Sequence, residues 1–129
     1  MNLNNRICAV IGLSYHGRAL VRKLIADPHA DLQVIFDNDP SKAGRDFLGV
    51  NIASMEDLVN FSCDEYCIAG RHIPELVKQL TQSYGVPKNK IRLFSKKEIE
   101  LDKLTLMERI KQTDEIFFFV KEVLERNHI

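Results

Sequence analysis

The sequence lacks long hydrophobic runs, an excess of either charge, and internal repeats. No apolar stretch approaches the roughly 20 residues that span a bilayer, and the start lacks a signal-peptide core, so we expect a cytoplasmic chain without a membrane partner. Lysine plus arginine number 18, as do aspartate plus glutamate, so no overall charge attracts nucleic acid. Any partner must therefore be recognised by a local site.

Cysteine is also scarce, and the three present form no disulfide or metal pattern. Cys63 and Cys67 lie four residues apart at the start of an expected strand. Extended chain rises about 3.3 Å per residue, which separates the two thiols too far for a disulfide. No pair, Cys8 included, has the spacing of metal ligands. We expect buried thiols and no metal.

The most informative stretch runs from an apolar strand through a glycine turn into a helix. Ile7–Ile11 is a near-continuous apolar run, typical of a strand buried on both faces of a parallel sheet. Gly12, Ser14 and Gly17 follow as G-x-S-x-x-G, and the next apolar residues recur at helical spacing. This order is that of the dinucleotide-binding fingerprint, with Ser14 in place of the second glycine. It predicts a phosphate cradle, the alternative being glycines that serve chain geometry alone.

An acidic residue stands where the fingerprint expects one. Asp37 follows Gly17 by about 20 residues, at the end of the apolar run 32–36, where an acid binds ribose hydroxyls. His16, inside the turn, is a second candidate ligand residue; the alternative is a loop residue that caps the helix. These residues predict a nucleotide site, and Asp37 should repel a 2′-phosphate, so that NADH binds better than NADPH.

A third strand end should bring basic groups to the same place. The strand 65–70 leads to Arg71 and His72, which would face the glycine turn across the point where the winding order of the sheet reverses. Arg71 could contact a phosphate and His72 the other end of the ligand. The alternative is a solvent-exposed loop pair. No catalytic residue is assigned, because His16 and His72 have no evident orienting carboxylate besides Asp37, which is already assigned to a ribose.

The predicted fold is a three-layer α/β domain with a mainly parallel five-stranded sheet in the order 3-2-1-4-5. Its strands are expected at 7–11, 32–36, 49–52, 65–70 and 91–94. We expect residues 1–101 to form this nucleotide-binding domain and residues 102–129 a helical extension of it. The basic run 88–97 lacks stacking aromatics and is interpreted as a solvated face.

The extension carries more apolar surface than one helix face can bury. Phe117, Phe118, Phe119 and Val120 are consecutive, so they span more than one face. We therefore expect a homodimer formed through this helix.

Four stretches carry a resemblance to a known family. They are 10–18, 36–40, 49–58 and 65–70. With them the chain resembles the small Rossmann-like nucleotide-sugar-binding domain at the start of bacterial sugar O- and N-acyltransferases of the sialic-acid and pilin-glycan type. It also resembles the domain preceding some nucleotide-sugar dehydratases. The resemblance implies a nucleotide or nucleotide-sugar site at Gly12, Ser14, His16, Gly17 and Asp37.

The departures from that family concern catalysis. No hexapeptide repeats follow, where the acyltransferases hold their catalytic histidine and acetyl-coenzyme A, and no dehydratase Tyr-x-x-x-Lys pair follows either. The expected function is binding of a UDP-sugar or NAD(H) in bacterial surface-polysaccharide biosynthesis, alone or as part of a larger enzyme. The alternatives are a small NAD(P)-dependent oxidoreductase or dinucleotide-sensing regulator, and a structural dimerisation module.

Overall fold

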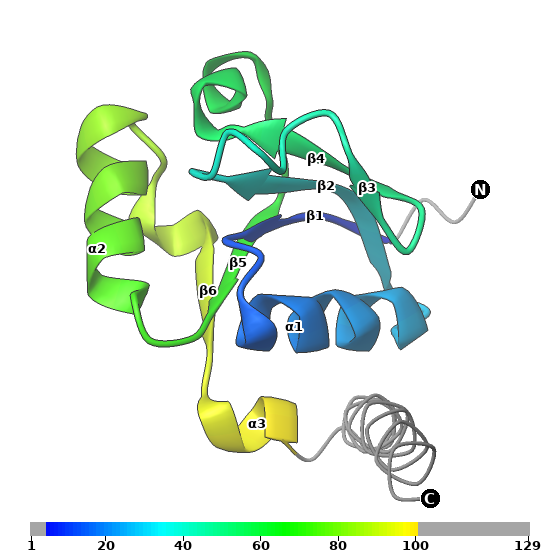
Figure 1. Ribbon diagram of the computed structural model, residues 1–129. Helices are drawn as coiled ribbons and strands as arrows, with labels where there is room; N and C mark the ends of the chain where they lie inside the picture. Colours follow the sequence, from blue (N-terminus) through cyan, green and yellow to red (C-terminus); the bar gives the residue numbers. More distant parts are fainter. Residues whose placement is uncertain (1–4, 101–129) are drawn as a thin grey trace, which may run out of the picture.

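The computed structural model describes residues 5–100 of the chain (Figure 1). The expected extension at 102–129, and with it the self-association through 117–120, lies outside the described residues and stays a prediction. No helix within the described part is long and apolar enough to cross a membrane.

One six-stranded sheet runs in the order β3-β4-β2-β1-β5-β6. The strands are β1 (Arg6–Ile11), β2 (Ala30–Asp37), β3 (Asp46–Phe47), β4 (Val50–Ser54), β5 (Glu65–Ala69) and β6 (Ile91–Phe94). Every neighbouring pair is parallel except β3 with β4. The five parallel strands follow the predicted order, but the predicted total of five strands was wrong because β3 adds a sixth.

The missed strand is a two-residue edge strand joined to β4 by a tight turn. Leu48 and Gly49 form this turn, with φ angles of 54° and 81°. Two consecutive positive φ angles are typical of the type I′ hairpin turn, which favours Asn-Gly or Asp-Gly. The sequence signal was absent because leucine occupies the first of these positions.

Helices cover both faces of the sheet and make three layers (Figure 1). The α-helices are α1 (Tyr15–Ala26), α2 (Ile73–Lys78) and α3 (Lys96–Glu100). The other helical turns are η1 (Met55–Asn60), η2 (Gln79–Ser83) and η3 (Lys88–Lys90). One buried cluster lies between the sheet and α1 with α3, and a second lies between the sheet and η1, α2 and η2. The helical segment after β5 has two parts, since α2 ends at Lys78 and a π-helical turn follows at 79–83.

The position of β1 sets the location of the site. β1 pairs with β2 on one side, where Ile11 lies opposite Phe36, and with β5 on the other, where Ile11 lies opposite Ile68. The chain first winds outward through β2 and β4 and then returns to β5 and β6, so the order reverses at β1. In open parallel sheets, ligands bind outside the carboxyl ends of the strands at such a point.

Candidate functional site

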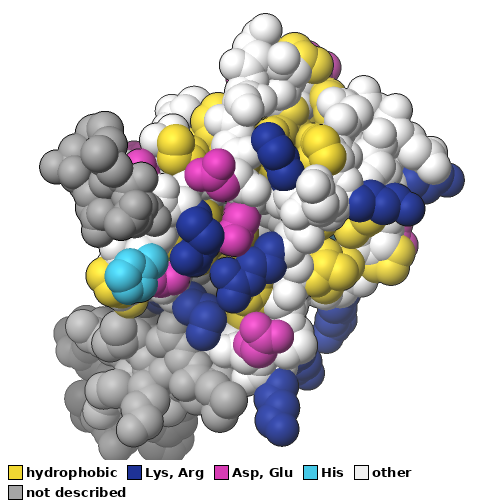
Figure 2. Space-filling view, turned by 180° about the vertical axis from the view of Figure 1, so that it is seen from behind, with side chains coloured by type: hydrophobic (Ala, Val, Ile, Leu, Met, Phe, Trp, Pro, Cys, Tyr) yellow, Lys and Arg dark blue, Asp and Glu magenta, His cyan; other side chains and the backbone are white. Residues whose placement is uncertain are grey.

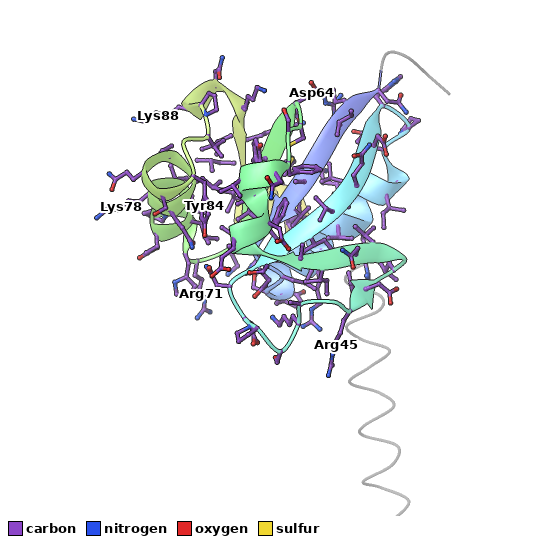
Figure 3. All side chains as sticks on the ribbon, turned by 90° about the horizontal axis from the view of Figure 1, so that it is seen from above. Arg45, Asp64, Arg71, Lys78, Tyr84 and Lys88 are labelled. Atoms are coloured by element: carbon purple, nitrogen blue, oxygen red, sulfur yellow. The ribbon has the colours of Figure 1, made fainter. Side chains whose placement is uncertain are left out.

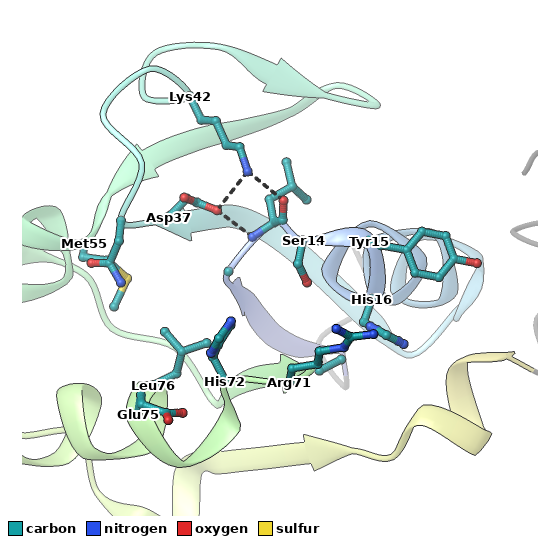
Figure 4. Close-up of a pocket in the computed structure, with 14 residues that line it drawn as sticks. Ser14, Tyr15, His16, Asp37, Lys42, Met55, Arg71, His72, Glu75 and Leu76 are labelled. Atoms are coloured by element: carbon teal, nitrogen blue, oxygen red, sulfur yellow. Dashed lines mark hydrogen bonds and ion pairs between the residues drawn. The ribbon is translucent and has the colours of Figure 1, made fainter. Parts of the chain in front are cut away.

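A pocket of about 570 Å³ opens at the carboxyl ends of β1, β2 and β5 (Figure 4). Its volume is in the range of small-molecule sites. It is lined by Gly12, Leu13, Ser14, Tyr15, His16, Asp37, Asn38, Lys42, Met55, Ala69, Arg71, His72, Glu75 and Leu76. Six of the seven residues predicted for the site line this one pocket, although they come from three separate parts of the sequence. Gly17 is the exception.

Gly17 acts on the geometry of the turn from behind the pocket. It is buried in the first turn of α1, and a Cβ atom there would overlap the carbonyl oxygen of Gly12. Only a residue without a side chain lets α1 approach the end of β1 this closely. The last glycine of the fingerprint thus holds helix and strand together here, as the sequence suggested.

Ser14 occupies the helix N-cap. Its Oγ atom accepts a hydrogen bond of 3.3 Å from the N–H of Gly17, so the hydroxyl proton stays available for another acceptor. A Cβ atom on Gly70, which has a φ of 124°, would lie 3.3 Å from the same oxygen. The glycine therefore lets the end of β5 approach the cradle.

The Asp37 carboxylate is largely engaged by the chain itself. Its Oδ2 atom accepts the N–H of Leu13 at 2.7 Å, and its Oδ1 atom accepts the N–H of Asp39 at 2.7 Å. The Lys42 Nζ atom lies 3.7 Å from Oδ2 and donates to the Leu13 carbonyl at 2.9 Å. Only 11% of the Asp37 side chain is exposed. The acid therefore ties β2 to the glycine turn and keeps limited capacity for a ribose hydroxyl.

The remaining predicted side chains leave polar atoms for a ligand. Among the described residues, the Nε2 atom of His16 is buried without a hydrogen-bond partner, and the His16 ring packs edge-on against Tyr15 at 5.3 Å. His72 is the N-cap of α2, makes no side-chain capping bond and is exposed, as is Arg71. In Figure 4, Arg71 and His72 lie across the pocket from Asp37 and Lys42. The pocket thus has cationic groups on both sides of the cradle.

Sequence reasoning missed several lining residues, of which Lys42 has the clearest role. Asn38, Met55, Glu75 and Leu76 were also missed. The only local signal for Lys42 was its place in the turn after Asp37, because its contact with Leu13 joins residues 29 positions apart. Glu75 follows His72 by three residues on α2, but no hydrogen bond joins the two side chains.

A second titratable cluster lies away from the pocket. Cys8, Glu65 and Cys67 offer ligand atoms within 4.8 Å of one another, and among the described residues they are the one group able to surround a metal ion. A hydrogen bond between the thiols lowers the pKa of Cys8 and raises that of Cys67. Arg6 and Arg92 both pair with Glu65, and their positive charges oppose a cation, so we assign no metal here. All three cysteines of the chain are buried and unpaired, as expected.

Comparisons with known proteins support the fold. A scan of family models and a search of curated proteins each found no match. Among solved structures, the chain is similar to UDP-D-quinovosamine 4-dehydrogenase from Vibrio fischeri, with 13% identity and a TM-score of 0.55 over 70% of this chain and 77% of that one. It is also similar to RSP, a Rex-family repressor, with 16% identity and a TM-score of 0.54 over 92% of this chain and 64% of that one.

A third similar structure is apo scyllo-inositol dehydrogenase from Lactobacillus casei. Its identity is 20% and its TM-score 0.51, over 86% of this chain and 33% of the dehydrogenase. The chain thus spans only a third of that enzyme. At such identities the likeness shows a Rossmann-like α/β fold.

Proposed function

We propose that this chain binds a nucleotide-containing anion in the pocket at the carboxyl ends of β1, β2 and β5. The observation that carries the proposal is the convergence of a glycine turn, a helix N-terminus and Arg71 on one pocket. The N-terminus of α1 supplies backbone N–H groups and the positive end of a helix dipole, both of which favour a phosphate. Arg71 adds a guanidinium able to make two parallel hydrogen bonds.

The proposed role is that of a binding module in bacterial surface-polysaccharide biosynthesis, with a UDP-sugar as ligand. The resemblance to acyltransferase and dehydratase domains supports this role, and the similar Vibrio structure is by its name a dehydrogenase of a UDP-sugar. Binding is favoured over catalysis because, among residues 5–100, no carboxylate hydrogen-bonds to His16 or His72: Asp37 is engaged by Leu13 and Asp39, and Glu75 makes no bond to His72.

A dinucleotide-dependent function is the second candidate. RSP was solved in complex with NADH, and that structure matches 90% of this chain with a TM-score of 0.52. The glycine turn and the N-terminus of α1 fit either ligand, since both carry a pyrophosphate. The choice between an NAD(H) sensor or oxidoreductase and a UDP-sugar module therefore depends on the base and the second half of the ligand.

Isothermal titration calorimetry with UDP, UDP-glucose and NADH tests the proposal. We expect measurable binding of at least one of them, with Arg71→Ala weakening it by about tenfold, the effect of losing one charge-assisted contact. Lys78→Ala is the matched control, because Lys78 is an exposed cation of α2 that does not line the pocket. UDP compounds ahead of NADH would support the polysaccharide role, and NADH ahead would support the second candidate. Absence of binding at millimolar concentration, or equal affinities in the two variants, would contradict the proposal.

A further inference from the structure

A second hollow, of about 400 Å³, adjoins the main pocket on the side of the β3–β4 hairpin. The two share Leu13, Ser14, Tyr15 and Lys42, so they are continuous across the glycine turn. Arg18 of α1 and Arg45 of the loop before β3 also line the second hollow. Neither arginine belongs to the dinucleotide-binding fingerprint.

The charge of this hollow is positive. Its ionisable lining consists of Arg18, Lys42, Arg45 and Asp46, which makes three cations and one acid. The Asp46 carboxylate accepts a hydrogen bond of 3.3 Å from the N–H of Gly49. This acid is therefore partly engaged within the β3–β4 hairpin. Within residues 5–100, neither Arg18 nor Arg45 forms an ion pair. Two guanidinium groups are therefore left to solvent beside a concave surface.

The backbone holds these cations in position. The Arg45 carbonyl accepts a 2.8 Å hydrogen bond from the N–H of Ile52, which fixes the loop to β4. Arg18 lies in the first turn of α1, where its N–H donates to the Ser14 carbonyl at 2.9 Å. The Lys42 ammonium group donates one hydrogen bond to the Leu13 carbonyl. An ammonium group has three N–H donors, so two remain for other acceptors. An anion in the hollow would meet donors from two segments, α1 and the loop between β2 and β3.

The hollow lies beside the place where a ribose is expected. Lys42, which lines both spaces, has its Nζ atom 3.7 Å from the carboxylate of Asp37, the acid at the ribose position of the fingerprint. This ammonium group offsets the negative charge that would otherwise repel a phosphate there. Asp39 lies in the same turn, but its carboxylate accepts the hydroxyl and the N–H of Ser41 at 2.8 and 3.0 Å.

We propose that the hollow lined by Arg18, Lys42 and Arg45 binds a phosphate monoester carried on the ribose of the nucleotide held in the main pocket. The inference rests on the proposed nucleotide-binding function and narrows its ligand to a nucleotide with a ribose phosphate, which favours the second candidate, a dinucleotide, over a UDP-sugar. It reverses the preference for NADH over NADPH expected from Asp37 alone. The reason for the reversal is that Asp37 is bound by Leu13 and Asp39 and lies beside Lys42.

Two ligand pairs that differ in one ribose phosphate test this proposal. NADPH and NADH differ at the 2′ position, and coenzyme A and 3′-dephospho-coenzyme A differ at the 3′ position. We expect the phosphorylated member of at least one pair to bind about tenfold more tightly in calorimetry, the size of one or two charge-assisted hydrogen bonds. The preference should shrink with added salt, because the arginines are exposed.

Variants locate the preference. The double variant Arg18→Ala/Arg45→Ala should abolish it while leaving the affinity for the unphosphorylated member within about twofold, since that ligand does not reach the hollow. The matched control is Lys78→Ala/Lys88→Ala, which removes the same charge from two exposed lysines lying away from the hollow in Figure 3. It should retain the preference.

The outcomes separate the two proposals. If NADH, UDP or UDP-glucose binds but neither pair shows a preference, the ribose-phosphate site is overturned and the nucleotide-binding function stands. A preference that survives in the arginine double variant also overturns it. If no nucleotide binds at millimolar concentration, both proposals fall.

Discussion

The charged side chains differ between the two ends of the parallel strands. We call the side where these strands begin the amino edge and the side where they end the carboxyl edge. At the amino edge Arg6 lies 3.2 Å from Asp27 and 3.1 Å from Glu65, and Arg92 lies 3.5 Å from Glu65. At the carboxyl edge Arg18, Arg45 and Arg71 form no ion pair within the described residues. Figure 3 shows Arg45 and Arg71 on one side of the molecule and Asp64 on the other, and the view from behind in Figure 2 shows basic and acidic side chains intermingled.

The difference separates stability from binding. Paired charges at the amino edge satisfy one another and give a ligand little to recognise. Unpaired cations around the carboxyl pocket contribute nothing to folding through partners of their own, yet they attract an anion. The comparison implies that substitutions at the amino edge change stability and not affinity, and that removing cations at the carboxyl edge has the reverse effect.

Gly17 is expected to be an exception, because a substitution there should lower both stability and nucleotide affinity. It has the largest expected effect. A methyl group there overlaps the Gly12 carbonyl oxygen, so Gly17→Ala should cost about 3 kcal/mol of unfolding free energy and abolish nucleotide binding as well. Alanine would otherwise favour a helix by roughly 1 kcal/mol over glycine, so the sign alone is diagnostic. Urea denaturation followed by circular dichroism measures it.

Gly44→Ala is the control for that measurement. Gly44 has a φ of 84°, but a Cβ atom there meets nothing within 4 Å. The cost should be about 1 kcal/mol from the backbone conformation alone. Equal losses in the two variants would show that the clash with Gly12 is relieved by movement of α1.

Glu65→Ala tests whether a substitution at the amino edge changes stability without changing nucleotide affinity. It removes the partner of both Arg6 and Arg92, whose side chains are partly exposed, so we expect a loss of about 1 kcal/mol in unfolding free energy. Nucleotide affinity should stay within about twofold, because the pocket lies at the other edge. Added salt should reduce the difference from the native chain. A large loss of affinity in this variant would mean that the two edges are coupled.

The expected effect that is smallest near neutral pH is an alkaline one at Cys63, just before β5. Burial raises the pKa of this thiol from 9.0 to about 11. The unfolded chain therefore loses this proton first, so the thiol's contribution to stability is fully present below about pH 9 and is lost as the pH rises to about 11. Urea midpoints at pH 8, 9 and 10 should fall more steeply for the native chain than for Cys63→Ala. Parallel slopes would show that the folded protein ionises Cys63 as easily as the unfolded chain does.

Much of the fold followed from local pattern. The apolar run 7–11 formed β1, the helical spacing after Gly17 formed α1, and the parallel order around β1 agreed with the prediction. The strand β3 was missed because its hairpin turn contains Leu48 at a positive φ, a conformation that the pairing of β3 with β4 accompanies and that no local turn motif announces. The π-helical turn at 79–83 also had no local signal.

The sequence by itself determined that a glycine turn, an acid and an Arg-His pair occur at the ends of three apolar runs. Strand pairing is parallel, so those ends meet at one edge, and the pocket contained six of the seven predicted residues. Only the tertiary structure decided what the acid does. Asp37 bonds to Leu13 and lies beside Lys42, and the hairpin brings Arg45 to the same hollow as Arg18. Such contacts join segments many residues apart, and their energies depend on distances that no local pattern encodes.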